Sequence, residues 1–151
     1  MPIIRQLVTQ GGVDTFTAGT IDTNMTADGT VAWQINKIRA FWSDGYTAVA
    51  ADQLLSAVLA TQATVTVPTD SQEIDRVVFA ISNTAGVAVA YPMDLIKEVY
   101  PSAERLTVQP FLYLHVDSVG TGLANDVYFE IDYSVVKLSN PEVLRLLVGG
   151  S

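Results

Sequence analysis

The stretch FLYLHVDSVGTGLANDVYFEIDY, residues Phe111–Tyr133, alternates between apolar and polar side chains on either side of a glycine-containing loop. In its second half, Val127 and every second residue up to Val135 are apolar or aromatic, and most of the residues between them are acidic or polar. A period of two is typical of a β-strand with one buried face. We therefore predict a strand on each side of the loop, and the simplest topology is an antiparallel pair.

Similar short apolar stretches, broken by Gly, Asn, Asp and Pro, recur along the whole chain, which is typical of an all-β sandwich or barrel. A chain of 151 residues suits one domain. We expect residues 1–151 to form a single β-sandwich of two antiparallel sheets, with two or three short helices in the connections. Further strands are predicted at residues 3–8, 15–21, 31–42, 63–67, 74–82, 87–91 and 105–108.

Three segments show signals of short helices. Residues 52–61 begin with Asp52 as a possible cap and carry leucines and a valine at helical spacing, although a strand through the same residues is the alternative. Residues 94–100 begin with an aspartate and end before Pro101. Residues 139–148 begin with the S-x-x-E pattern of a capping box and end at two glycines.

The segment Val31–Trp42 contains a change of phase. Its apolar residues occupy odd positions up to Ile35 and even positions from Ile38 onward. A two-residue period changes phase only where an extra residue is inserted, so we predict a β-bulge near Asn36–Lys37. The alternative is that both faces are buried there and the phase carries no information.

Composition excludes several classes of site. The chain has no cysteine, which removes disulfides, zinc–thiolate sites and cysteine nucleophiles. The net charge is −8 and the eight basic residues are scattered, so the basic stripe that nucleic-acid binding needs is missing. The start of the chain has no signal-peptide pattern, and no apolar run is long enough to span a membrane.

Charged residues make up 16% of the chain, against about 25% in a typical soluble protein. A low charge favours a protein whose surface is partly buried against other subunits. The equally simple alternative is a β protein with a surface rich in Thr, Ser and Asn.

His115, the one histidine of the sequence, and the Gly120–Gly122 turn resemble parts of a catalytic site. Asp117 lies two residues from His115 on the same strand face, but no G-x-S-x-G nucleophile pattern is present and Ser118 points to the other face. The glycines lack the spacing, lysine and following helix of a phosphate loop. We predict a packed or interface histidine, and glycines that allow a positive φ in a loop.

The acidic residues offer two further alternatives, and neither has a supporting motif. Glu130 and Asp132 share a strand face at roughly 6–7 Å, a separation that would suit a glycosidase pair but also suits a solvated face. Turn aspartates could contribute to calcium sites, yet no EF-hand-like run is present. We therefore expect no catalytic residues, no cofactor and no metal. The turn aspartates are Asp22, Asp28 and Asp126.

Aromatic side chains on strands are the stronger functional signal, because interfaces are enriched in them. Some of them lie opposite the expected core, where a neighbouring subunit or a second layer of the same domain must cover them. The candidate subunit-interface residues are Ile3, Ile4, Trp42, Phe111, Tyr113, His115, Tyr128, Leu144 and Leu147.

The long strand WQINKIRAFW and the closing segment NDVYFEIDYSVVKLSNPEVLRL, with short helices in the connections of a small all-β chain, resemble small viral capsid proteins of the single jelly-roll type. The resemblance implies eight strands in two four-stranded sheets, assembly into shells and no catalysis. Many such coats carry a basic arm for the genome, and this chain has none.

The leading hypothesis is a structural virion protein, a capsid subunit or outer-shell component, that self-assembles in the host cytoplasm. Its partners would be further copies and other virion proteins, with no direct nucleic-acid contact and no small-molecule substrate. Residues 3–8 and 143–148 would be the exchanged elements. The alternative is a carbohydrate-binding or adhesin module in which Trp33, Trp42 or Tyr128 stacks on sugar rings. An enzyme with a cryptic acidic pair is the third possibility.

Overall fold

The computed structural model describes residues 2–25, 31–42, 52–67, 69, 71–84, 87–90, 94–98, 106–122 and 124–139. All regular structure in these ranges is β, and none of the described residues forms a helix that could cross a membrane. The strands are β1 (Ile3–Thr9), β2 (Thr17–Asp22), β3 (Val31–Trp42), β4 (Gln53–Ala60), β5 (Glu73–Thr84), β6 (Val87–Ala90), β7 (Asp94–Glu98), β8 (Leu106–Thr107), β9 (Phe111–Val119) and β10 (Asp126–Lys137).

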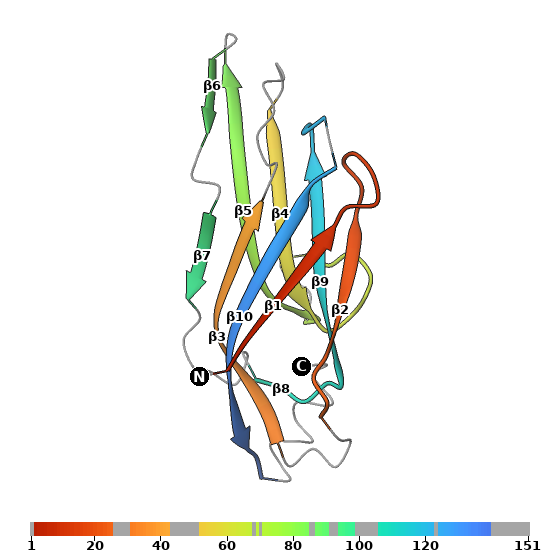
Figure 1. Ribbon diagram of the computed structural model, residues 1–151, viewed down its shortest axis with the longest axis vertical. Coiled ribbons are helices and arrows are strands. Elements are labelled where there is room, and N and C mark those ends of the chain that lie inside the picture. Colours follow the sequence, from red (N-terminus) through yellow and green to blue (C-terminus); the bar gives the residue numbers. More distant parts are fainter. Residues whose placement is uncertain are drawn as a thin grey trace.

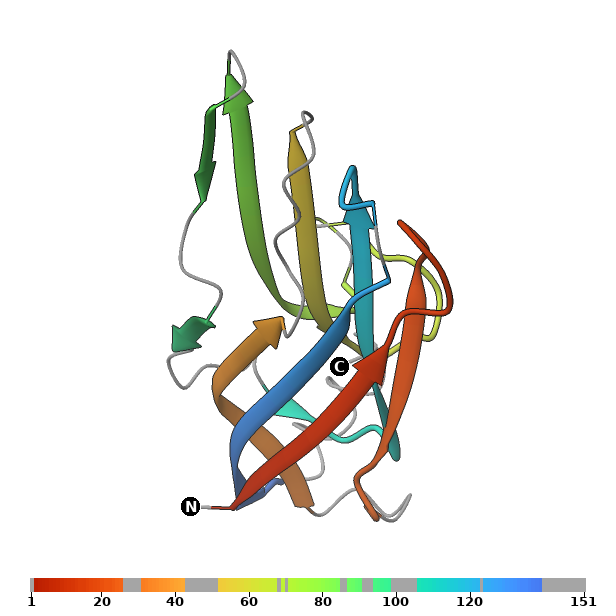
Figure 2. The same ribbon diagram turned by 45° about the horizontal axis from the view of Figure 1, so that its top comes forward.

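The strands form two antiparallel sheets that face each other (Figure 1). Sheet A has the order β1-β10-β3-β7, with β8 also paired to β3, and sheet B has the order β2-β9-β4-β5-β6. Apart from the β4–β5 and β5–β6 hairpins and the short β8, successive strands alternate between the sheets. This is the strand order of a jelly roll, and it confirms the predicted fold class. Figure 2 shows the two layers from a second direction.

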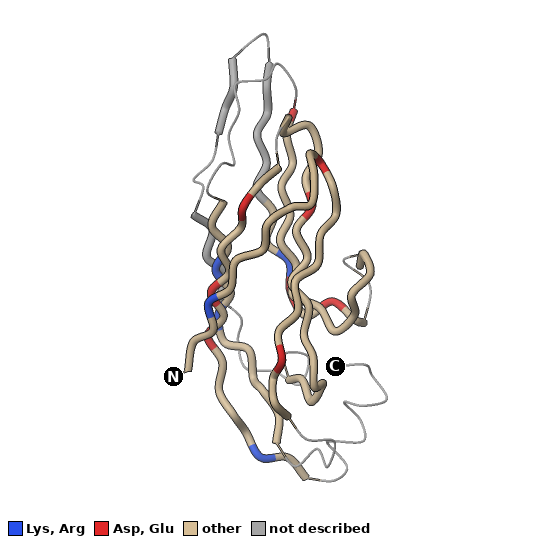
Figure 3. Tube along the Cα trace, turned by 45° about the vertical axis from the view of Figure 1, so that its right-hand side comes forward, with Lys and Arg blue, Asp and Glu red and all other residues tan. Residues whose placement is uncertain are grey.

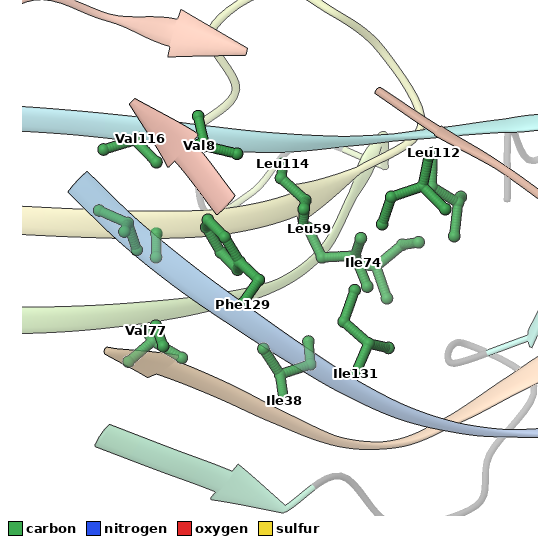
Figure 4. Packing of buried hydrophobic residues seen from close by; sticks show 14 of the residues in the cluster. Val8, Ile38, Leu59, Ile74, Val77, Leu112, Leu114, Val116, Phe129 and Ile131 are labelled. Carbon is green, nitrogen blue, oxygen red and sulfur yellow. The ribbon is translucent and has the colours of Figure 1, made fainter. Parts of the chain in front are cut away.

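The core lies between the sheets. Phe129 and Ile131 of β10 point inward from sheet A, and Leu59 and Leu114 point inward from sheet B (Figure 4). All four are at most 2% exposed, and each such side chain contributes roughly 1.5–3 kcal/mol on burial. The period-two alternation of the sequence therefore marks the inner face of both sheets.

The predicted hairpin between the two halves of the opening stretch is wrong. β9 pairs with β2 and β4 in sheet B, whereas β10 pairs with β1 and β3 in sheet A. Both strands have one apolar face, and they turn these faces toward each other across the core. The loop between them therefore crosses from one sheet to the other.

Two predicted helices are strands, and one predicted strand is a loop. Residues 53–60 form β4, the alternative left open by the sequence, and residues 94–98 form β7. β4 lies between β9 and β5 and is buried on both faces over part of its length, so its apolar residues lose the period of two. β7 gains a hydrogen-bonded partner in β3, whereas a helix of one or two turns is marginal on its own. Residues 63–67 form no strand, and residues 140–151, which hold most of the predicted C-terminal helix, lie outside the described residues.

The bulge prediction is confirmed. Asp132 of β10 is paired with Lys37, and the next residue, Tyr133, is paired with Ile35, which leaves Asn36 as the extra residue of β3. The amide of Asn36 donates a hydrogen bond of 2.8 Å to the hydroxyl oxygen of Ser134 on the neighbouring strand. The inserted residue keeps the apolar residues on both sides of it directed into the core.

Candidate subunit interface

The predicted interface residues do not form one surface. Ile3 and Tyr128 lie on the outer face of sheet A at 44% and 49% exposure, whereas Phe111 lies on sheet B at 45%. Ile4 packs partly against the core and Tyr113 is half-buried. Trp42 and His115 are 1% and 2% exposed within the chain itself, so neither can supply an exposed contact. Leu144 and Leu147 lie outside the described residues.

The outer face of sheet A carries an apolar row across three strands. Leu7 of β1 is paired with Tyr128 of β10, which is paired with Phe41 of β3. These three side chains are 46%, 49% and 41% exposed. The rings of Tyr128 and Phe41 lie 6.5 Å apart at 47°, a distance at which aromatic rings attract each other. A row of large apolar side chains this exposed is unusual on a surface that water alone covers.

The next row of the same face is charged. Arg5, Glu130 and Arg39 occupy neighbouring register positions on β1, β10 and β3. The Arg5 Nε atom donates to a Glu130 carboxylate oxygen at 2.9 Å. Asp132 and Lys37 face each other in the row below. Basic and acidic positions of sheet A therefore lie side by side (Figure 3).

A shallow hollow of about 240 Å³ lies where the apolar and charged rows meet. Its lining is almost entirely apolar, although arginine and glutamate stems form part of its wall. Long charged side chains commonly cover apolar surface with their stems in this way. The residues that line it are Arg5, Arg39, Phe41, Tyr128, Phe129 and Glu130.

Phe41 and Leu7 were not among the sequence candidates. Phe41 could have been found, because the residues that follow the bulge alternate and Phe41 falls between two inward-facing positions. Leu7 carried no such signal, since β1 has no clear alternation of apolar and polar residues.

The outer face of sheet B is partly covered by the chain's own loops. His115 contacts the ring edge of Phe16, with centroids 5.0 Å apart, and its Nε2–H donates to the Gln62 carbonyl at 2.7 Å. Above it, Arg76 holds the β4–β5 loop by donating to the Thr66 carbonyl at 2.7 Å and to Glu73 at 2.8 Å. The outward-facing ring of His115 is therefore covered by a second layer of the same chain. A neighbouring subunit was the other possibility that the sequence left open.

His115 has the surroundings of a structural residue. Burial lowers its pKa below the ordinary value of 6.5, and nearby Arg76 adds to this, while the Gln62 carbonyl and Glu73 act in the opposite direction. The hollow beside it measures about 20 Å³, enough for one water molecule. Ser118, the nearest candidate nucleophile in sequence, is engaged in a separate network on the other side of the sheet.

That network shows what the Gly120–Gly122 turn does. Gly120 and Gly122 have φ values of 74° and 75°, as predicted for glycines that allow a positive φ. The backbone N–H groups of Gly120 and Thr121 both donate to the Asp14 carboxylate at 3.1 Å. The hydroxyls of Ser118 and Thr121 donate to the same carboxylate at 3.0 and 2.9 Å. The turn is an anion-binding nest, and its anion is a side chain of this protein.

A buried layer of amide groups lies beneath Asp14. The Gln10 side-chain oxygen accepts from the backbone N–H of Asn125 at 2.8 Å and from its side-chain amide at 3.1 Å. The Gln10 amide donates to the Thr15 carbonyl at 2.9 Å and to the Ser118 hydroxyl at 3.0 Å. These bonds join the β1–β2 loop to the β9–β10 loop and hold the end of the sandwich. Asp14 and Gln10 carry no recognisable motif, so the sequence did not predict this network.

The other candidate sites find no support in the geometry. Glu130 is bonded to Arg5, and the described residues contain no cluster of three or more His, Cys, Asp or Glu suited to a metal ion. Asp22 accepts from the backbone of Asn24 in a tight turn, and Asp28 lies outside the described residues. Trp33 and Trp42 are 5% and 1% exposed, which leaves only Tyr128 of the three residues proposed to stack on sugars.

No protein-family model matches the chain, and no curated protein matches it by sequence. Among solved structures, it is similar to a chain from Desmodium yellow mottle tymovirus, with a TM-score of 0.34 and 12% sequence identity. The similarity covers 92% of this chain and 91% of that chain.

Proposed function

We propose that the protein is a structural virion subunit, a single jelly-roll domain that acts by self-association. The observation that carries the proposal is the outer face of sheet A, with its exposed apolar row of Leu7, Tyr128 and Phe41 and the hollow beside it. Interfaces between subunits combine such apolar and aromatic anchors with a polar rim. On this face, the charged row that begins at Arg5 supplies the rim.

The composition supports the same function. A chain with 16% charged residues has fewer charged side chains that a contact between copies would have to desolvate than a typical soluble protein has. A net charge of −8 disfavours direct contact with nucleic acid, and the basic residues that lie together on sheet A, Arg5, Lys37 and Arg39, alternate with acidic ones. A subunit of this kind would serve a shell in which other components shield the genome, or an outer layer of the virion.

The function is tested by the size of the purified protein in solution. We expect light scattering after size-exclusion chromatography to show a mass that rises with concentration above the 16.2 kDa of one chain. Negative-stain microscopy of the native source should show the protein in particles. A strict monomer up to millimolar concentration, with no particles in the source, would remove the proposal.

A further inference from the structure

We propose that the outer face of sheet A binds the same face of a second copy of this chain, around a two-fold axis that runs along the strands midway between β10 and β3. The inference deepens the proposed function and rests on it, since it names the surface and the partner of self-association. Its basis is the charge and apolar pattern of the three register rows on this face.

A two-fold contact brings one surface against itself, so residue i of one copy meets residue j of the other, and j meets i. Within one chain, each outward residue of β10 is paired with a residue of β3. With the axis between these two strands, a β10 residue of one copy faces the equivalent of its β3 partner in the second copy. Tyr128 then meets Phe41 of the second copy, and the reciprocal contact is identical. Two pairs of exposed aromatic rings are thus buried against each other.

The charged rows match under the same operation. Glu130 lies over Arg39 of the second copy and Asp132 lies over Lys37, each pair occurring twice. An axis placed along β10 itself would instead put Glu130 over Glu130 and Asp132 over Asp132. Like charges that face each other are repulsive, so the pattern selects the position between the strands.

The near balance of basic and acidic residues on this face also suits it to contact a second copy. Each chain carries a net charge of −8, so two copies repel each other as a whole. On this face the three rows hold Arg5, Lys37 and Arg39 against Glu130 and Asp132, and β7 adds the positions of Asp94 and Glu98, so three basic and four acidic residues give a local charge of −1. Repulsion between two copies is therefore weaker where these faces meet than the net charge of −8 would suggest.

The size of the face sets the expected strength. With the axis between β10 and β3, β1 of one copy lies over β7 of the other, so four strands at about 4.8 Å and three rows at about 6.8 Å span roughly 19 by 20 Å. This footprint is smaller than the roughly 800 Å² that each partner buries in a standard interface. We therefore expect a weak, reversible dimer that is populated at tens to hundreds of micromolar.

A matched pair of phenylalanines separates this face from the other. Phe41 and Phe111 are 41% and 45% exposed on the outer faces of sheets A and B. We expect Phe41→Ser to weaken dimerisation by about tenfold and Phe111→Ser to leave it unchanged, measured by sedimentation equilibrium. The inference is wrong, while the proposed function stands, if the unaltered chain self-associates and only Phe111→Ser weakens the association. The same holds if neither variant weakens it. If the unaltered chain is monomeric throughout, both fall.

A charge exchange tests the two-fold operation itself. Arg39→Glu and Glu130→Arg each place like charges opposite each other in a dimer of identical copies, and each should dimerise at least tenfold more weakly. An equimolar mixture restores both opposite-charge pairs and should dimerise about as well as the unaltered chain. A mixture as weak as its components would overturn the axis, provided that both variants keep the circular dichroism spectrum and cooperative melting of the unaltered chain.

Discussion

Replacement of Gly120 by alanine should destabilise the protein strongly, although the residue lies in a loop. Gly120 has a φ of 74°, in the left-handed region that side chains disfavour. A Cβ atom at this position would lie 2.4 Å from the backbone carbonyl oxygen of Asp52, well inside van der Waals contact. The opposing group is backbone, so the loop itself must move.

The cost can be worked out from three contributions. The left-handed conformation costs an alanine about 1–2 kcal/mol relative to glycine. Displacement of the loop removes the two backbone hydrogen bonds to Asp14, which contribute about 1 kcal/mol each. The lower entropy of the unfolded alanine chain offsets about 0.4–1 kcal/mol. The sum is a destabilisation of about 3 kcal/mol, which corresponds to a melting temperature lower by roughly 6–12 °C in a domain of this size.

Urea denaturation and differential scanning calorimetry measure this difference, and Gly11→Ala is the matched control. A Cβ at Gly11 would meet its nearest neighbour, the Thr17 hydroxyl, at an ordinary 3.7 Å, so this variant should stay within about 0.5 kcal/mol of the parent. If the two variants have the same stability, the nest does not hold the loop as described. The reasoning is refuted if Gly11→Ala loses as much free energy of unfolding as is expected for Gly120→Ala. It is equally refuted if neither variant loses any.

Three further predictions concern the bulge and the two titrating groups. Deletion of Asn36 should abolish folding, because the part of β3 on one side of the bulge must then turn its core residues outward. Asn36→Ala removes only the hydrogen bond to Ser134 and should lower the free energy of unfolding by about 1 kcal/mol. Circular dichroism and urea denaturation distinguish the two variants. His115 has a lowered pKa in the folded state, so the unfolded state binds its proton more tightly and stability should fall as the pH drops below 6.5. In the His115→Gln variant, the urea midpoint should depend less on pH in that range. A pH dependence equal to that of the unaltered chain would contradict the assignment. Burial alone would raise the pKa of Asp14, but the hydrogen bonds from Thr121, Ser118 and Gly120 lower it below 3.8. The stability that the charged carboxylate contributes is therefore present above pH 3.8 and lost as the pH falls through the folded pKa. The Asp14→Asn variant should be less stable at pH 7 in urea denaturation and should lack this loss of stability in acid.

The sequence allowed the fold class and the inner faces to be predicted because both depend on short-range periodicity. Val127, Phe129 and Ile131 alternate with polar residues, and any strand with that pattern must bury one face. The phase change at Asn36 was equally local, since an inserted residue is the only way to keep Ile35 and Ile38 on one face. The helical spacing in residues 52–61 misled for the same reason, because a strand covered on both faces shows no period of two.

The candidate site depended on contacts between distant residues. Tyr128 could be recognised as an outward aromatic, but its neighbours Leu7 and Phe41 come from strands about 120 and 90 residues away, and only the register shows that they form one row. The glycine turn was correctly predicted to need a positive φ, yet the carboxylate that fills it belongs to Asp14, 106 residues earlier in the chain.

By itself, then, the sequence determined that this protein is a β-sandwich, which side of each strand is buried and where β3 needs its extra residue. Only the tertiary structure decided that β9 and β10 lie in opposite sheets, that a loop covers His115, and that Leu7, Tyr128 and Phe41 form one exposed row beside charged residues on sheet A. The physical reason is that side-chain alternation along a strand selects a face but not a partner. The partner is selected by the hydrogen bonds and packing of the whole sandwich, over separations that local pattern does not encode.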